Sequence, residues 1–308
     1  MLDNKDVIGL VASCGKLCVS LLTILSGFGL TESYKKRECE DFRQNIKFVL
    51  SHLVQLYSMY WSVFLIALSI MFSEGNSIST LYGKGIEGML FLVVDFMGLA
   101  AIFKSTALIG AWYLTTIIIF YVFYPIFYYF VKKLGIIILF LAYLPWIYYL
   151  VIGNVDMHTD WWGFYLFSFL LGLYLSDKRV LNRLYKINGL KVFFISLIIF
   201  IIFVILRLYL TLPIDPLLSF SIILLEIFVL SRFSFITGFL KSLGEQSANI
   251  WLIHPVIIYT FNSVIFKSNL WKFALVLFTS MVLSMLIEMM KAGLNINKYV
   301  IRIRKEFI

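Results

Sequence analysis

The chain has 308 residues, of which 61% are hydrophobic and 14% are charged, and its mean hydropathy is +0.94. Soluble globular proteins contain about 45–50% apolar and about 25% charged residues, so too few polar side chains remain here to coat a soluble core. The net charge of +9 lies in short basic clusters between apolar runs, a pattern typical of membrane proteins rather than of nucleic-acid-binding proteins. The composition therefore predicts one all-α integral membrane domain over residues 1–308, a polytopic transmembrane helix bundle with the lipid bilayer as partner and no nucleic acid.

Apolar runs of about 20 residues predict membrane-spanning helices. The charged amphipathic stretch Tyr34–Asn45 is expected to form a helix on the inner leaflet. A further apolar segment, Gly85–Ile102, is ambiguous because it carries Glu87 and Asp95. The predicted spans are Lys16–Leu30, Leu53–Phe72, Trp112–Val131, Leu134–Ile152, Trp161–Ser176, Leu190–Thr211, Leu217–Ser231, Ala248–Phe266 and Trp271–Met290.

The basic clusters decide how the ambiguous segment is interpreted. Positive loops lie in the cytoplasm, and two such loops must be separated by an even number of spans. Counting Gly85–Ile102 as a full span would place Lys132 and Lys133 outside, so we expect this segment to be re-entrant or to lie at the outer interface. The prediction is then about nine spans, a cytoplasmic C-terminus and an external Met1. The basic clusters are Lys35–Arg43, Lys132–Lys133, Lys178–Lys186 and Lys298–Lys305.

Ionisable groups inside predicted spans are the first candidates for chemistry, because lipid offers them no partner. His254 precedes Pro255, which interrupts the backbone hydrogen bonds of a helix. One interpretation is a histidine that ties a helix kink to a neighbouring carbonyl. The other is an acid/base pair with Glu226, which lies at a similar depth on the preceding span.

Other polar residues also admit two interpretations. Arg207 lies near the outer end of its span, where its side chain either reaches the interface or contacts substrate. Glu288 lies beside Lys291 and is expected to be structural. The loop at 154–162 contains His158 and Asp160 before two tryptophans, which form an interfacial belt or contact an external acceptor. The sequence contains no nucleotide-binding loop, hydrolase elbow or metal-binding helix, so we expect no metal site and no bound cofactor.

Four segments, in this order, resemble the bacterial membrane-bound acyltransferase family 3, whose members O-acylate cell-surface glycans. Each motif is weak alone, but their order covers almost the whole chain. The segments are Ser26-Gly27-Phe28 at the end of an apolar run; Trp112-Tyr113-Leu114 followed by Tyr121 and Pro125; Phe169-Leu170-Leu171-Gly172; and Leu243-Gly244, Ser247 and Trp251-Leu252-Ile253-His254-Pro255.

The resemblance implies transfer of an acyl group, expected to be acetyl, from a cytoplasmic acyl-CoA co-substrate to a hydroxyl of an envelope glycan. It implies a multi-pass protein of the bacterial cytoplasmic membrane. We expect His254 and Glu226 to act in catalysis. The residues and the resemblance together give the expected substrate-binding set: Ser26, Trp112, Tyr121, His158, Asp160, Arg207 and Ser247.

The chain departs from the family pattern in two places. The family has ten spans, and the first carries an arginine and the proposed catalytic histidine. Nine spans and an external Met1 predict that this first span is missing here. We therefore expect the chain expressed alone to have negligible acyltransferase activity. In addition, His52, Gln55 and Ser58 stand where the family shows arginines associated with the acyl donor. Two alternatives to acyl transfer therefore stay open: a transporter or flippase of a polysaccharide pathway, and an inactive member that scaffolds a partner.

Overall fold

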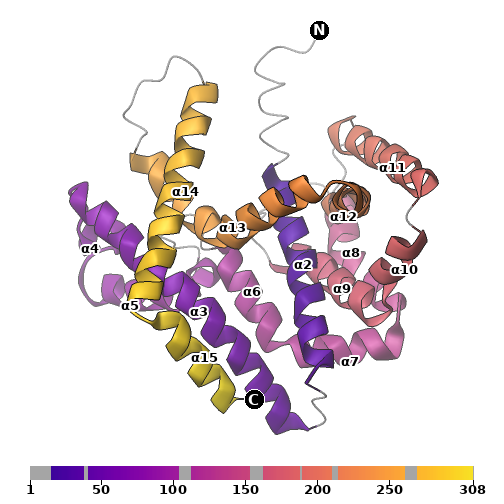
Figure 1. The fold of residues 1–308 in the computed structure, drawn as a ribbon. Coiled ribbons are helices and arrows are strands. Elements are labelled where there is room, and N and C mark those ends of the chain that lie inside the picture. Colours follow the sequence, from indigo (N-terminus) through magenta and orange to yellow (C-terminus); the bar gives the residue numbers. More distant parts are fainter. Residues whose placement is uncertain are drawn as a thin grey trace. The chain divides into compact units, whose positions relative to one another are not determined.

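The computed structural model describes residues 15–37, 41–103, 112–152, 162–187, 189–209, 214–260 and 269–307, and within these ranges it contains helices and no β-strand. The predicted all-α, polytopic helical architecture is confirmed. The chain divides into two compact units. Unit 1 comprises residues 1–39 and 123–237, and unit 2 comprises residues 40–122 and 238–308. Figure 1 labels the helices in chain order.

Unit 1 is organised around the contact between α2 (Gly15–Lys35) and α9 (Trp162–Asp177). The two helices approach closely through small residues. A Cβ atom on Gly27 would lie 2.4 Å from the carbonyl oxygen of Phe169, and one on Gly172 would lie 2.1 Å from that of Ile24. The hydroxyls of Ser20 and Ser168 form a hydrogen bond of 2.7 Å in the same contact. Small residues serve this purpose in membrane proteins because they let backbones pack directly against each other.

The remaining helices of unit 1 pack around this pair. α7 (Tyr124–Leu134) and α8 (Ile137–Ile152) contact α9, and α12 (Asp215–Arg232) packs on both α2 and α11 (Leu190–Tyr209). The short amphipathic helix α10 (Val180–Ile187) follows α9 within the basic cluster predicted at Lys178–Lys186.

Unit 2 is built on α3 (Phe42–Ser73), a helix of 32 residues. α6 (Trp112–Val122), α14 (Asn269–Gly293) and α15 (Ile296–Glu306) pack against it, and α15 lies alongside α3 in Figure 1. The core also includes α13 (Ser234–Thr260), which belongs to unit 2 from Gly238 onward. The buried side chains at the centre of this hydrophobic core include Tyr60, Val63, Phe64 and Ala67 of α3, Leu114 and Ile118 of α6, Leu252, Ile253, Val256 and Ile257 of α13, and Val276 and Ile287 of α14.

The segment Gly85–Ile102 does not form a full span, as predicted. It contains α5 (Gly85–Phe96), a turn at Gly98 with φ of 69°, and the 3-10 helix η1 (Ala100–Phe103). Twelve residues of helix extend about 18 Å, which is shorter than the hydrocarbon core of about 30 Å.

The carbonyl groups at the end of α5 are satisfied by side chains of unit 2. Tyr60, Trp61 and Tyr57 of α3 donate to the carbonyls of Asp95, Phe96 and Met97, and Thr115 of α6 donates to that of Gly98. A helix that ends at membrane depth requires such partners, because lipid supplies no donors. This arrangement fits the predicted re-entrant or interfacial segment: its end is anchored to protein, while Ile86, Met89 and Leu90 of α5 are exposed.

The carboxylate of Asp95 is itself completely buried, and Tyr82 of α4 (Ile78–Tyr82) donates to its Oδ2 at 2.9 Å. Burial, and after it the neighbouring carboxylate, raises the pKa of Tyr82, so the phenol keeps its proton and remains a donor.

Three details of the sequence prediction require correction or stay open. The single helix expected over Tyr34–Asn45 is wrong: α2 ends at Lys35, and α3 starts anew at Phe42, where Asp41 and Gln44 form a capping box. The span predicted over Trp112–Val131 is wrong as one helix, because α6 ends at Val122 and α7 starts with Pro125 in its first turn. Proline lacks the N–H that would continue the hydrogen-bond ladder.

The number of spans stays a prediction. Among the described helices, α2, α3, α11 and α14 have the length and hydropathy of a full span, and α6 with α7 makes a fifth if the pair is one broken span. α8 and α9 are helices of 16 residues each, shorter than the runs of about 20 residues that a span requires.

Candidate functional site

His254 occupies a gap in the backbone hydrogen bonds of α13. Pro255 has no N–H, so the carbonyl of Trp251, four residues earlier, loses its helical donor. The Nδ1 atom of His254 lies 2.7 Å from that carbonyl oxygen. Because a carbonyl only accepts hydrogen bonds, Nδ1 must carry the hydrogen and donate it. This contact agrees with one of the two interpretations from the sequence, a histidine tied to a carbonyl beside Pro255, and the other interpretation, a role in catalysis, stays a prediction.

This contact also determines the state of the other ring nitrogen. When Nδ1 of a neutral imidazole holds the hydrogen, the lone pair is on Nε2, and no described residue forms a hydrogen bond with Nε2. An imidazole oriented through one nitrogen can accept a proton on the other. A structural role of Nδ1 is thus compatible with base chemistry at Nε2.

The surroundings of His254 in unit 2 keep α13 in place. Asn249 donates to Glu288 of α14 at 2.9 Å, and Lys291 donates to the same carboxylate oxygen at 2.8 Å, which confirms that Glu288 forms a structural ion pair. The indole of Trp251 packs edge-on against Tyr113 of α6, with ring centroids 5.2 Å apart. The residue that accepts from His254 is therefore itself fixed by packing.

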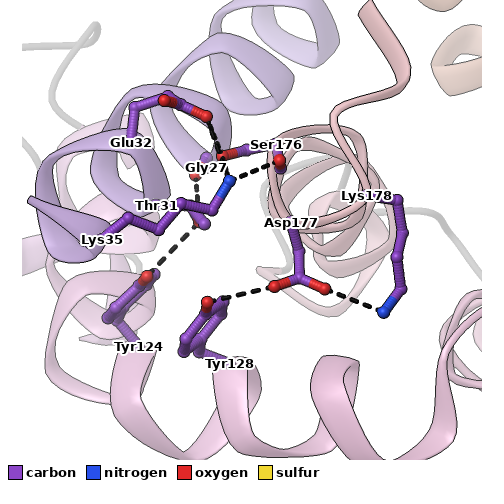
Figure 2. Close-up of polar contacts among 9 residues, drawn as sticks. All are labelled: Gly27, Thr31, Glu32, Lys35, Tyr124, Tyr128, Ser176, Asp177 and Lys178. Carbon is purple, nitrogen blue, oxygen red and sulfur yellow. Dashed lines mark hydrogen bonds and ion pairs between the residues drawn. The ribbon is translucent and has the colours of Figure 1, made fainter. Parts of the chain in front are cut away.

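A second group of polar side chains gathers in unit 1, where the C-terminal ends of α2 and α9 meet α7 (Figure 2). Ser176 of α9 donates to Glu32 of α2 at 2.6 Å. Lys35 donates to Glu32 at 3.2 Å and to both the hydroxyl and the carbonyl of Ser176. The carboxylate and the ammonium thus neutralise each other while joining α2 to α9.

α7 is attached to both helices by its tyrosines, as Figure 2 shows. Tyr124 donates to Thr31 of α2 at 3.4 Å, and Tyr128 donates to Asp177 of α9 at 3.1 Å. The other oxygen of Asp177 pairs with Lys178 at 3.0 Å. Each charged group drawn in the figure has a partner within the cluster, so this group of residues positions three helix ends and offers no unengaged base.

The remaining predicted site residues lie in different surroundings. Ser26 is half-buried on α2, next to Gly27, and Ser247 donates to the carbonyl of Gly244 within α13. Trp112 begins α6, and Tyr121 near its end lies edge-on to His52 of α3 at 6.3 Å. These contacts neither support nor exclude a role in substrate binding.

Arg207 forms an ion pair with Asp215, which links the end of α11 to the start of α12. Glu226 is half-buried on α12 in unit 1, whereas His254 belongs to unit 2, and their predicted pairing stays a prediction. His158 and Asp160 lie outside the described residues.

The sequence interpretation missed the residues of the unit 1 cluster, above all Glu32, Ser176 and Asp177. One signal was present: Glu32 and Asp177 each follow the end of a predicted span within two residues, and each precedes the lysine that begins a basic cluster, by three residues and by one. Their mutual contacts could not be inferred, because Lys35 and Ser176 are 141 positions apart.

Comparison with known families assigns the chain as a whole. The model of the acyltransferase family 3, described as an acyltransferase domain, matches residues 3–289. No curated protein and no solved structure matches the chain.

Proposed function

The chain belongs to this family of membrane acyltransferases, and from that premise we propose that it transfers an acyl group, acetyl in the first instance, from cytoplasmic acyl-CoA to a hydroxyl of an envelope glycan. The apolar helices make it a multi-pass membrane protein. The proposal includes the bacterial cytoplasmic membrane as its location and a cytoplasmic C-terminus, both supported by the basic clusters of the sequence.

The observation that carries this proposal is the hydrogen bond from Nδ1 of His254 to the carbonyl of Trp251. With Nδ1 engaged, Nε2 accepts the proton of the acceptor hydroxyl as its oxygen attacks the carbonyl carbon of the thioester. The new C–O bond forms, the C–S bond breaks, and the proton on Nε2 passes to the departing thiolate. The products are an ester on the glycan and free coenzyme A. General-base assistance of this kind contributes about 10²–10⁴-fold to a rate.

The test separates the two nitrogens of His254. In His254→Asn, the amide nitrogen can replace Nδ1 as donor to Trp251, but no atom replaces Nε2. We expect the variant, introduced into the chromosomal gene, to accumulate normally in the membrane and to lose ester formation by about 100-fold or more. Mass spectrometry of the surface glycan measures the ester, and immunoblotting of membranes measures the protein.

Ser280→Ala in α14 is the control, because Ser280 is a buried side chain of unit 2 that donates to the carbonyl of Val276 within its own helix and belongs to no expected site. It should retain the ester. Normal ester in His254→Asn would refute the role of His254 as base. If deletion of the gene removes the glycan itself from the surface, rather than its ester, the protein acts in transport and the proposal fails.

A further inference from the structure

The helix α15 lies beyond the matched family segment, which ends at residue 289, yet it packs on α3 of the same unit. It carries Lys298, Arg302, Arg304 and Lys305 against a single acidic residue, Glu306. Only Leu294 and Asn295 separate α15 from α14, a candidate span. The basic helix is therefore held close to the end of a span, at the depth where phosphate groups of lipids and of soluble cofactors are both accessible.

One of these cations is directed towards α3 rather than towards solvent. The Nη1 atom of Arg304 donates to the amide oxygen of Gln55 at 2.6 Å, which fixes the plane of the guanidinium. Its Nε atom is buried and has no hydrogen-bond partner among the described residues. A buried N–H without an acceptor is costly, and Nε is not itself a point of entry. Arg304 as a whole is half-buried, so an anion can reach the guanidinium through its exposed part.

The position of Gln55 indicates what kind of ligand can reach the guanidinium. The side chain of Gln55 is exposed, two residues inside the start of the predicted span at Leu53. α3 extends about 48 Å, more than the hydrocarbon core of about 30 Å, so its N-terminal part extends into the interface. Two further cations, Arg43 and Lys47, lie on that part of α3. An anion in the interface would meet positive charge on both helices.

We propose that Arg304, oriented by Gln55, binds a phosphate group at the contact between α15 and α3. A guanidinium presents a planar fork of N–H donors that matches phosphate oxygens, and its charge strengthens each bond. Two sources share this chemistry. One is the phosphate-bearing end of the acyl-CoA donor, and this assignment rests on the proposed function. The other is the headgroup of an anionic lipid, and this assignment is independent of the proposed function.

The experiment compares two charge-neutralising variants of the full chain in nanodiscs. Arg304→Gln removes the oriented guanidinium, and Arg302→Gln removes an exposed cation of the same helix with the same loss of charge. Coenzyme A binding to phosphatidylcholine nanodiscs tests the donor source. Retention of phosphatidylglycerol by protein extracted from mixed phosphatidylcholine–phosphatidylglycerol nanodiscs tests the lipid source. We expect Arg304→Gln to weaken one of the two interactions by about tenfold or more, and Arg302→Gln to weaken it by less than about threefold.

Gln55→Leu provides a test without any change of charge. It removes the acceptor that orients Arg304, so it should weaken the same interaction, and size-exclusion profiles of the nanodiscs check that each variant is folded. Equal losses in Arg304→Gln and Arg302→Gln would show diffuse attraction by the whole helix and overturn the proposal, as would no loss in either. If the wild-type protein binds no coenzyme A but Arg304→Gln loses phosphatidylglycerol, the phosphate site stands and the proposed acyl-CoA donor fails.

Discussion

Replacing Gly172 by alanine tests the close packing of α2 against α9. The new Cβ would lie 2.1 Å from the carbonyl oxygen of Ile24, more than 1 Å closer than the 3.4 Å at which ordinary contact begins. The obstacle is backbone, so it cannot rotate away, and the helices must separate. Overpacking of this kind costs about 1–3 kcal/mol, and the serine–serine hydrogen bond in the same contact would lengthen as well. We expect a loss of about 2–3 kcal/mol in the free energy of unfolding relative to the control described next.

Gly29→Ala is that control, because Gly29 lies on α2 and a Cβ there meets no atom within 4 Å. Alanine favours helix over glycine by up to about 1 kcal/mol in both variants, so the comparison cancels this gain. Unfolding by sodium dodecyl sulfate in mixed micelles, followed by tryptophan fluorescence, measures the difference. Gly27→Ala should behave like Gly172→Ala, since its Cβ would lie 2.4 Å from the carbonyl oxygen of Phe169. If Gly172→Ala unfolds at the same detergent fraction as Gly29→Ala, the close contact of α2 with α9 is incorrect.

Two further predictions follow from unit 2. His254→Leu should lower the free energy of unfolding by about 1–3 kcal/mol, because it leaves the carbonyl of Trp251 without a donor. In a Pro255→Ala background, where the backbone N–H returns, the same substitution should cost less than about 0.5 kcal/mol. Equal losses in the two backgrounds, measured by the same detergent titration, would show that His254 does not replace the missing backbone donor. Single cysteines at Ser79 and Ile102, which are both exposed and flank α5, should both react with an impermeant maleimide in intact cells, since α5 is too short to cross. Reaction at only one of them would show that the segment crosses the membrane.

The sequence was sufficient to predict features that depend on length, charge and local backbone chemistry. Glu87 and Asp95 argued against a full span over Gly85–Ile102, and the structure ends α5 at Phe96. For His254-Pro255, one of the two interpretations was an imidazole tied to a carbonyl, and the hydrogen bond to Trp251 agrees with it, because proline always removes the same backbone donor.

Features that depend on tertiary contacts or on competing local signals were not predicted. Charge and amphipathicity suggested one helix over Tyr34–Asn45, but the cap formed by Asp41 and Gln44 starts a new helix at Phe42. Pro125 lies inside the span predicted over Trp112–Val131, although proline is equally suited to the first turn of a following helix. The side chains that satisfy the end of α5 come from α3 and α6, and no local pattern indicates which donors will meet which carbonyls.

The α2–α9 contact gives a physical reason for two of the segments that carry the family resemblance. Ser26-Gly27-Phe28 and Phe169-Leu170-Leu171-Gly172 each appear weak when considered alone. In unit 1 they form opposite sides of one contact: Gly27 lies against the backbone of Phe169, and Gly172 lies against the backbone of Ile24. Each glycine leaves room for the backbone of the other helix, so a larger residue at either position would push α2 and α9 apart. The hydrogen bonds of Glu32, Lys35 and Ser176 lie beyond this contact at the ends of the same two helices, and they can form only while that close approach is kept.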